Sequence, residues 1–357
     1  MMKLLHSADW HLGAPLLLRD PEQAQRLRHA QMELPATISG LCREHDCQLL
    51  LLSGDLFDGT CSRDVVQTVK QALEDVRIPV FISPGNHDCV TDQSPWKTEL
   101  WPSNVHIFLR PEITSVALPE LDCRVYGAGY QQMDCPGLLE GFRAQQEERY
   151  AIGVLHGDPT QLSAPYCPIT APQVAQSGLS YLALGHIHKT GSFRAGDTLC
   201  AWPGCPMGRG YDEQGEKGVL LVTLGDDAQS RFLPLNMPRF YDLQTPAGED
   251  PVQAVSALLP PAGSEDFYRI TLTGPCEPFD PEALVSHFPQ VPQLVLRDKT
   301  TPPTDVWGSA GEDTFEGRYF RLLHDSMENA DPDSQRLYRL AATISRQILD
   351  GQEVILP

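Results

Sequence analysis

Polar motifs at the ends of apolar runs are the feature that most constrains how this chain folds. Four motifs directly follow an apolar run typical of a buried strand, and the first motif closes such a run at residues 3–8. Each motif alone has little weight, because Asp, Asn, His and Gly are common in turns. Together and in order they predict one shared site, since open α/β sheets bind ligands at the carboxyl ends of their strands. The motifs are Asp9-x-His11, Gly54-Asp55-Leu56-Phe57-Asp58, Gly85-Asn86-His87-Asp88, His156-Gly157-Asp158 and Gly185-His186-Ile187-His188.

The side chains in these motifs are typical metal ligands. Carboxylate and amide oxygens combined with imidazole nitrogens suit manganese, iron, zinc or magnesium, and no motif contains a thiol. The set is too large for one tetrahedral ion but sufficient for two ions that share a bridging ligand. Two ions about 3.5–4 Å apart form the usual clamp for in-line displacement at phosphorus. The seven candidate ligands are Asp9, His11, Asp55, Asn86, His156, His186 and His188.

Strand-like and helix-like segments alternate along the first two thirds of the chain, which predicts a layered α/β fold. Two helices are predicted at residues 21–45, with Pro35 as an interruption, and at residues 64–76. The strands that deliver the motifs are predicted at residues 3–8, 47–53, 80–83, 150–155 and 181–184. The strands of a second sheet are predicted at residues 105–108, 124–126, 199–202 and 218–224.

The motif string resembles that of the calcineurin-like metallophosphoesterases. Within that superfamily, residues 5–13 and 54–58 are most similar to the SbcD-type DNA repair nucleases, particularly to the shorter YhaO-like bacterial proteins. Residues 202–206 and 215–219 resemble the segment that closes the nuclease domain of that family. The resemblance covers roughly the first two thirds of the chain. It implies a four-layer sandwich of two mixed sheets flanked by helices.

The resemblance also implies how the ligands are shared. The implied ligands of the first ion are Asp9, His11, Asp55 and His188, and those of the second are Asp55, Asn86, His156 and His186. Asp55 would be the bridge. In the family, a water molecule activated by the two ions attacks the phosphodiester. The ligand set and the family favour manganese, with magnesium, iron or zinc as alternatives.

Two residues of the motifs remain for proton transfer. His87 would donate a proton to the leaving oxygen, and Asp58 occupies the position whose carboxylate orients that histidine in many metallophosphoesterases. Archaeal and eukaryotic relatives of the nuclease carry a histidine at this position, so the polarity of the pair stays open. Arg209 follows a Pro-Gly-rich turn and is either a contact to the substrate phosphate or an ordinary solvated cation.

The character of the chain changes after residue 238, and three parts are predicted: a nuclease domain at 1–238, a cap domain at 239–305 and a helical segment at 306–357. A strand, a helix and a second strand, at residues 268–273, 280–288 and 293–297, resemble the small α+β cap of SbcD-type proteins. Two helices are predicted at residues 314–327 and 332–350. The apolar stripe of the second helix either packs on its own protein or docks on a coiled-coil ATPase of the SbcC type, the partner that the resemblance implies.

Composition limits the partners. No apolar run approaches the length of about 20 residues that spans a bilayer. The start lacks a signal-peptide core, and the 10 cysteines are irregularly spaced, so we expect a cytoplasmic protein with reduced thiols and no membrane partner. The net charge of −20 is unusual for an enzyme that binds nucleic acid. A local basic groove, a partner subunit or a small phosphoester substrate would each account for it.

These observations favour a two-metal phosphodiesterase that acts as a DNA exonuclease or endonuclease in DNA repair, as the nuclease subunit of an SbcCD-like complex. The alternative keeps the chemistry and changes the substrate to a small phosphodiester or phosphate monoester. A third hypothesis, a scaffold without catalysis, conflicts with the intact ligand set and with His87. Family members are often homodimers, which makes a homodimer possible here.

Overall fold

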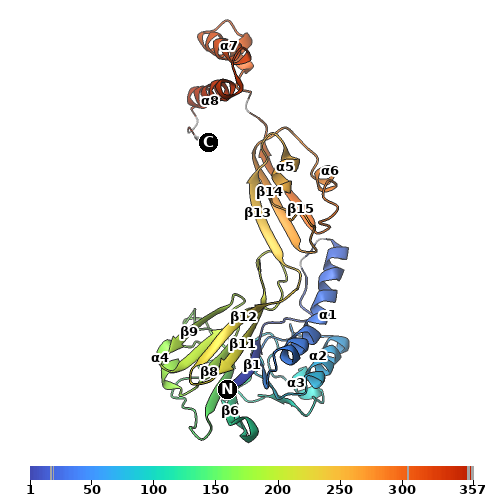
Figure 1. Cartoon of the computed structure of the whole chain (residues 1–357), viewed down its shortest axis with the longest axis vertical. Helices are drawn as coiled ribbons and strands as arrows, with labels where there is room; N and C mark the ends of the chain where they lie inside the picture. The colour runs from blue at the N-terminus through green and yellow to red at the C-terminus, as the bar shows by residue number, and fades with distance from the viewer. Residues whose placement is uncertain (17, 19, 304, 352–353, 355–357) are drawn as a thin grey trace. The chain divides into compact units, whose positions relative to one another are not determined.

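The computed structural model describes residues 1–16, 18, 20–303, 305–351 and 354 (Figure 1). The chain divides into two compact units. The first contains residues 1–242 and 265–268, and the second contains residues 243–264 and 269–357. The last residues of the predicted helical segment, 352, 353 and 355–357, lie outside the described residues.

The first unit contains two six-stranded sheets. The first sheet has the order β12-β11-β1-β2-β3-β4, and β1 to β4 are parallel, whereas β11 pairs antiparallel with both β1 and β12. Its strands are β1 (Met2–Ser7), β2 (Leu49–Leu52), β3 (Val80–Ile82), β4 (Val105–Ile107), β11 (Gly218–Leu224) and β12 (Ala228–Pro234). Two predicted placements were wrong, since β4 and β11 belong to this sheet and not to the second. Sequence periodicity identifies a strand but carries no information about its partner.

The second sheet has the order β5-β6-β7-β8-β10-β9. Its central strands β6, β7, β8 and β10 run parallel, and the antiparallel strands β5 and β9 form its edges. The strands are β5 (Thr114–Leu118), β6 (Cys123–Gly127), β7 (Tyr150–His156), β8 (Tyr181–Gly185), β9 (Gly191–Ala195) and β10 (Thr198–Trp202). The sequence patterns predicted β6, β7, β8 and β10 but not the two edge strands.

Successive side chains of the central strands point to opposite faces of their sheet and so contribute to three different apolar layers. Leu4, Leu49 and Leu51 pack against Ile152 and Val154 between the two sheets. Their neighbours in sequence, among them Leu5, Leu50 and Leu52, point to the other face and pack against α1 and α2. A third cluster covers the outer face of the second sheet. The mixed four-layer α/β architecture that was predicted is therefore confirmed.

The helices of the first unit are α1 (Pro21–Glu44), α2 (Arg63–Val76), α3 (Pro95–Thr98) and α4 (Ala171–Gln176), with a 3₁₀ turn at Pro119–Leu121. Helix α1 continues through Pro35, so the predicted interruption was wrong. Leu34 and Ile38, on either side of Pro35, are fully buried, and this packing offsets the hydrogen bond that a proline cannot donate.

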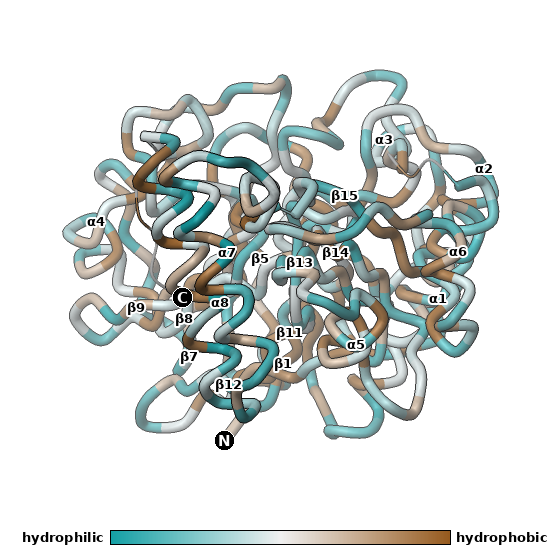
Figure 2. The backbone as a smooth tube through the Cα atoms, turned by 90° about the horizontal axis from the view of Figure 1, so that it is seen from above, coloured by the Kyte–Doolittle hydropathy of each residue, from teal (hydrophilic) through white to brown (hydrophobic). Residues whose placement is uncertain are grey.

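The second unit includes most of a small sheet with the order β13-β14-β15 and two terminal helices. Its elements are β13 (Phe240–Pro246), α5 (Pro251–Ser256), β14 (Phe267–Pro275), α6 (Pro281–Val285), β15 (Leu294–Thr301), a 3₁₀ turn at Gly308–Gly311, α7 (Phe315–Glu328) and α8 (Pro332–Leu349). The predicted strand-helix-strand order is present as β14, α6 and β15. Hydrophobic and hydrophilic residues alternate along α8 (Figure 2). Within the described residues, no helix combines the length and apolar composition that a bilayer crossing requires.

Candidate metal centre

Five strand ends from both sheets bring the predicted ligands together. β1, β2 and β3 lead into the segments that carry Asp9, Asp55 and Asn86, while β7 and β8 lead into His156 and His186. This is the arrangement that the motif positions predicted. Glycines allow the close approach, because a Cβ at Gly85 would collide with the Asp55 carboxylate.

Four of the seven predicted ligands have a left-handed backbone. The φ angles are 55° at Asp9, 45° at His11, 53° at Asp55 and 94° at His186. Such conformations are costly for residues other than glycine and concentrate at functional sites, where the surrounding structure enforces them. Here hydrogen bonds contribute to that enforcement, because the backbone N–H of His186 donates to the Asp9 carboxylate at 2.9 Å. The backbone N–H of His87 donates to Asp55 at 2.9 Å.

A first group of ligand atoms comes from Asp9, His11 and His188, which lie within 4.8 Å of one another. The Nε2 atoms of His11 and His188 are 3.1 Å apart. The Nδ1 atom of His11 is buried and has no hydrogen-bond partner among the described residues. Two imidazole nitrogens that face each other beside a buried carboxylate fit a shared cation.

A second group surrounds Asp55. The Nε2 atom of His156 is 3.3 Å from the Asp55 carboxylate and 2.9 Å from the Asn86 side-chain oxygen. The Nδ1 atom of His186 lies 3.3 Å from the same Asn86 oxygen. Asp55 also reaches the first group, since its carboxylate is 3.7 Å from His11 Nε2. The geometry therefore fits two cation positions with Asp55 between them.

Two of the imidazoles are oriented through the nitrogen that faces away from the centre. His156 Nδ1 lies 2.9 Å from the Ser53 carbonyl oxygen, and His188 Nδ1 lies 2.7 Å from the Glu213 carboxylate. Each contact favours the tautomer that leaves Nε2 available as a ligand, which is the usual support for metal-binding histidines. Glu213 was not predicted. It lies in an irregular loop between β10 and β11, outside every motif, so the sequence offered no signal for it.

Arg209, for which the sequence left open a phosphate contact or a solvated cation, is held by the same carboxylate. Its guanidinium donates to the two Glu213 oxygens at 2.7 and 3.2 Å, and its backbone N–H donates at 2.9 Å. The guanidinium is also 3.4 Å from His188 Nδ1. Arg209 is thus placed beside the centre, where it anchors the residue that orients His188.

His87 and Asp58 form a pair at the edge of the centre. Their side chains are 2.7 Å apart through His87 Nδ1, and the His87 side chain is 40% exposed. The rings of His87 and His11 have centroids 4.7 Å apart. His87 Nε2 is therefore the nitrogen available to a molecule bound from solvent next to the predicted ligands.

Burial and the charges of neighbouring groups shift the pKa values of the residues at the centre. Burial lowers the pKa of His11 to about 3. For His156 burial acts in the same direction, but the Asp55 carboxylate outweighs it and raises the pKa to about 9. Burial opposes ionisation of Asp55, yet His156 and His11 hold its pKa below the usual range. A proton on His156 thus occupies the place beside Asp55 that a cation would take, so the donor set fits divalent metal ions.

Two further aspartates of the motifs support the loops that carry the ligands. Asp88 accepts hydrogen bonds from the backbone N–H groups of Gly85 at 2.7 Å and Leu56 at 2.8 Å. Asp158 accepts from Thr160 and Gln161 at 2.7 and 2.9 Å. These carboxylates hold the loops in which the ligands lie.

His6 links the two sheets beneath the centre. It is fully buried in β1, and its ring nitrogens lie 2.7 Å from the hydroxyls of Tyr181 in β8 and of Ser53. Burial lowers its pKa to about 3, so it is neutral in the folded protein. His6 therefore has a structural role between the two sheets.

Known proteins share parts of this chain. It is 33% identical over 250 residues to the uncharacterized metallophosphoesterase YhaO of Bacillus subtilis (strain 168), a match that covers 63% of this chain and 58% of that protein. The chain thus matches less than two thirds of the length of this relative. Solved structures of an archaeal phosphodiesterase and of a dimetal phosphatase from Danio rerio align at TM-scores of 0.39 and 0.44, with 15% and 11% identity. The alignment with the archaeal phosphodiesterase covers 66% of this chain and 100% of that one. The alignment with the dimetal phosphatase covers 65% of this chain and 95% of that one.

A family model also matches the part of the chain that carries the centre. The model for the calcineurin-like phosphoesterases matches residues 2–190, which include all seven predicted ligands and the His87–Asp58 pair. On this match the chain belongs to the calcineurin-like phosphoesterase family and is a metallophosphoesterase.

Proposed function

We propose that this metallophosphoesterase is a DNA nuclease of the SbcD type that uses two divalent ions to hydrolyse phosphodiesters. The observation that carries the proposal is the combination of a complete two-cation donor set with a separate His87–Asp58 pair beside it. A phosphodiesterase needs both parts, because charge at phosphorus must be neutralised while the leaving oxygen is protonated.

Each residue has a defined task in this proposal. The ions would be held by Asp9, His11 and His188 on one side and by Asn86, His156 and His186 on the other, with Asp55 shared. Bound divalent ions supply charge neutralisation and a nucleophile at neutral pH. Asp58 holds His87 through Nδ1, so that Nε2 can transfer its proton to the departing oxygen. The mixed oxygen and nitrogen donors favour manganese.

Two features of the sequence bear on whether the substrate is DNA or a small phosphoester. The SbcD-like motif segments support DNA, whereas the net charge of −20 favours a small phosphodiester or monoester as the alternative. A DNA nuclease with this charge requires either a local basic site or a partner that supplies affinity.

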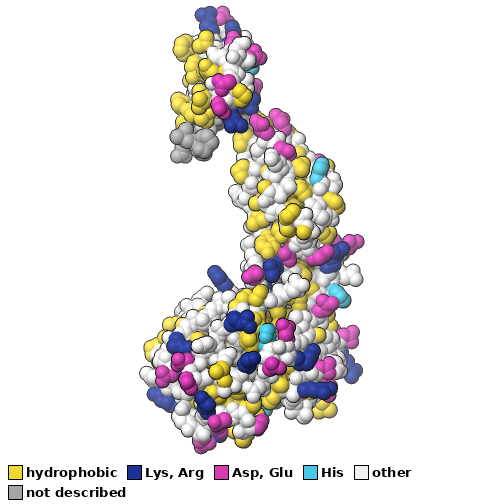
Figure 3. All heavy atoms as spheres, viewed as in Figure 1, with side chains coloured by type: hydrophobic (Ala, Val, Ile, Leu, Met, Phe, Trp, Pro, Cys, Tyr) yellow, Lys and Arg dark blue, Asp and Glu magenta, His cyan; other side chains and the backbone are white. Residues whose placement is uncertain are grey.

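For the partner we propose a coiled-coil ATPase of the SbcC type that docks on α7 and α8. Hydrophobic side chains gather along one side of this helix pair (Figure 3). Phe315 is 90% exposed, and Leu337 and Ile348 of the predicted stripe are 66% and 61% exposed. Exposed apolar side chains of this kind support a binding surface. Co-purification with a coiled-coil ATPase of the SbcC type, and its loss in Leu337→Glu, would test the contact.

The experiment that tests the catalytic proposal compares three substrates. Labelled single-stranded DNA, labelled double-stranded DNA and bis-p-nitrophenyl phosphate are incubated with manganese and with wild-type, His87→Ala or Asp55→Ala protein. Cleavage of DNA and of the aryl diester, with loss of DNA cleavage in both variants, is the expected result. Hydrolysis of the aryl diester while both DNAs survive, with the ATPase added, would instead favour the small-molecule alternative.

A further inference from the structure

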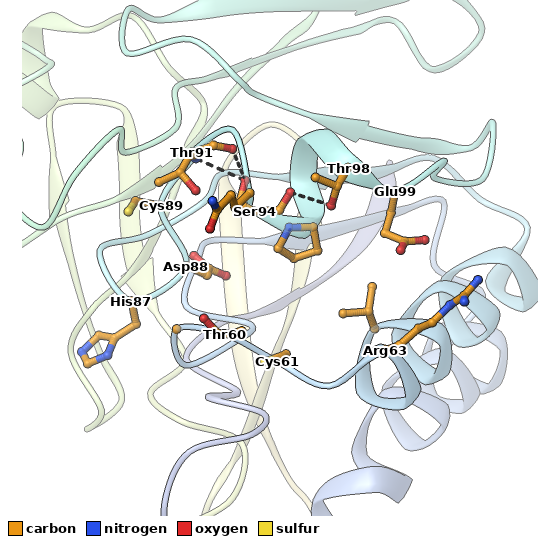
Figure 4. A pocket seen from close by; sticks show the side chains of 14 residues that line it. Thr60, Cys61, Arg63, His87, Asp88, Cys89, Thr91, Ser94, Thr98 and Glu99 are labelled. Carbon is orange, nitrogen blue, oxygen red and sulfur yellow. Dashed lines mark hydrogen bonds between the residues drawn. The ribbon is translucent and has the colours of Figure 1, made fainter.

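A pocket of about 540 Å³ opens beside the His87–Asp58 pair (Figure 4). Its walls come from the segment before α2, from the first turns of α2, and from the segment that runs from His87 into α3. It lies wholly in the first unit and includes none of the seven predicted ligands. The lining residues that carry the argument are Arg63, His87, Asp88, Thr91 and Glu99.

His87 connects this pocket to the reaction. His87 lines the edge of the pocket while its ring is turned toward the centre, where it packs against His11 and its Nδ1 is committed to Asp58, which leaves Nε2 free (Figure 4). In the proposed reaction His87 protonates the departing oxygen, so the group attached to that oxygen must lie next to His87. The pocket is therefore on the side of the centre where the leaving group is expected.

The carboxylates of the pocket already have partners within the protein. Asp88 is buried and accepts backbone hydrogen bonds from Gly85 and Leu56. Glu99 accepts from Lys70 Nζ at 2.8 Å and from the Gln67 amide at 3.1 Å. Neither carboxylate presents an uncompensated negative charge to a ligand.

Arg63 gives the pocket a positive charge that no carboxylate pairs with among the described residues. It is exposed in the first turn of α2, and among the described residues no hydrogen bond or ion pair engages its guanidinium. It contributes, after Lys70, to lowering the pKa of Glu99, but it forms no ion pair with that residue. The 14-residue helix adds the positive end of its dipole at the same place. A guanidinium at such a position suits a phosphate group.

We propose that this pocket binds the leaving-group nucleotide, with Arg63 contacting the phosphate that follows the scissile one. This inference rests on the proposed phosphodiesterase function and specifies its substrate as a strand with a further phosphate on the leaving side. The exposed hydroxyl of Thr91, which makes no side-chain hydrogen bond among the described residues, provides a polar wall for the sugar. A local basic site of this kind also reconciles a nucleic acid substrate with a net charge of −20.

The test uses dinucleotides that differ by one phosphate. Thymidylyl-thymidine is compared with its 5′-phosphorylated and 3′-phosphorylated forms, because either nucleoside could be the leaving group. Cleavage between the two nucleosides is followed by chromatography with manganese present. For the wild type we expect kcat/KM to be roughly tenfold higher for one phosphorylated form, as one charge-assisted phosphate contact provides.

Three variants test whether the preference for the phosphorylated dinucleotide depends on Arg63. Arg63→Ala should abolish it, and Arg63→Lys should retain part of it. Arg231→Ala, which removes an exposed arginine of β12 that does not line the pocket, should keep it in full. Bis-p-nitrophenyl phosphate has no second phosphate, so its hydrolysis should change less than about twofold in all variants.

The possible failures are distinguishable. If wild-type protein hydrolyses the aryl diester but treats the three dinucleotides alike, the pocket assignment is wrong and the phosphodiesterase proposal stands. The same conclusion follows if Arg63→Ala keeps the preference. If no diester is hydrolysed with manganese, magnesium, iron or zinc, the proposed function itself is wrong, and the pocket assignment is rejected with it.

Discussion

The two sheets of the first unit contribute different chemistry to one centre. The first sheet leads into the three oxygen donors Asp9, Asp55 and Asn86 and into one imidazole, His11, whereas the second leads only into imidazoles, those of His156, His186 and His188. Neither sheet completes either group of ligands on its own. The ligands therefore meet only when the two sheets pack against each other. Metal binding thus depends on the apolar layer between the sheets.

The two sets of ligands are also held by different means. Carboxylates of the first sheet accept backbone N–H groups, as Asp55 does from His87 and Asp9 from His186. Two imidazoles, His156 and His188, are instead held through their outer nitrogens, by the Ser53 carbonyl and by Glu213. The comparison implies that losing the shared Asp55 carboxylate disrupts both cation positions, whereas losing an orienting contact weakens one of them.

The largest effect is expected for Asp55→Ala. This change removes the carboxylate that lies between the two ligand groups, so bound manganese should fall well below two ions per chain and diester hydrolysis should fall at least about 10³-fold. Metal analysis after equilibrium dialysis, together with bis-p-nitrophenyl phosphate kinetics, measures both. Asp227→Ala removes an exposed carboxylate outside the centre and serves as the control. Two retained ions in Asp55→Ala would contradict a shared ligand.

His87→Ala should separate proton transfer from metal binding. We expect DNA cleavage to fall about 10²- to 10⁴-fold, the usual contribution of a positioned acid, while metal content stays at the wild-type level. Hydrolysis of bis-p-nitrophenyl phosphate should fall less, because p-nitrophenolate departs without full protonation. An equal loss for both substrates, or a loss of metal, would mean that His87 acts on the ions and not on the leaving group.

Glu213→Gln tests whether the Glu213 carboxylate orients His188, a ligand that follows β8 of the second sheet. The amide keeps the size of the side chain but loses the charge that accepts from His188 Nδ1 and Arg209. Manganese affinity at one position should fall about 10- to 100-fold, as is typical when an orienting partner of a ligand is lost. Titration calorimetry reports the two positions separately. Glu216→Gln, an exposed acid of the same loop, is the matched control, and an identical titration curve for both variants would exclude the role given to Glu213.

The smallest effect concerns the link between the sheets through His6. Its pKa is lowered to about 3 in the folded protein, so below pH 6.5 the unfolded chain binds a proton that the folded chain does not. The stability associated with neutral His6 is present above pH 6.5 and is lost as pH falls toward 3. Between pH 7 and pH 5 the loss amounts to about 2 kcal/mol.

Urea unfolding at pH 7 and pH 5 measures this dependence. His6→Gln should be less stable than wild type at pH 7, because hydrogen bonds to Tyr181 and Ser53 are weakened, but its stability should change less between the two pH values. Parallel pH dependence in both proteins would show that His6 is not the group responsible.

Local patterns predicted most of the strands and most of the centre, since period-two burial and ligand motifs are properties of short segments, but β5, β9, β12 and β13 were not predicted. The course of α1 through Pro35 could not be predicted in this way, because distant packing at Leu34 and Ile38 outweighs a local preference. Glu213 and the partner of β11 are invisible for the same reason, as both depend on contacts between residues far apart in the chain. Arg209 was singled out, but only the structure relates its charge to Glu213.

The position of β11 in the first sheet has a consequence for how the protein is made. β1 leaves the ribosome well before one of its two neighbours, β11, which lies more than 200 residues later in the chain. Until residue 224 has emerged, one edge of β1 is unpaired and the inter-sheet layer lacks Leu220 and Val222. The matched family segment, which ends at residue 190, is thus synthesised before its own fold can close. Such long-range pairing slows folding and leaves an exposed strand edge during synthesis.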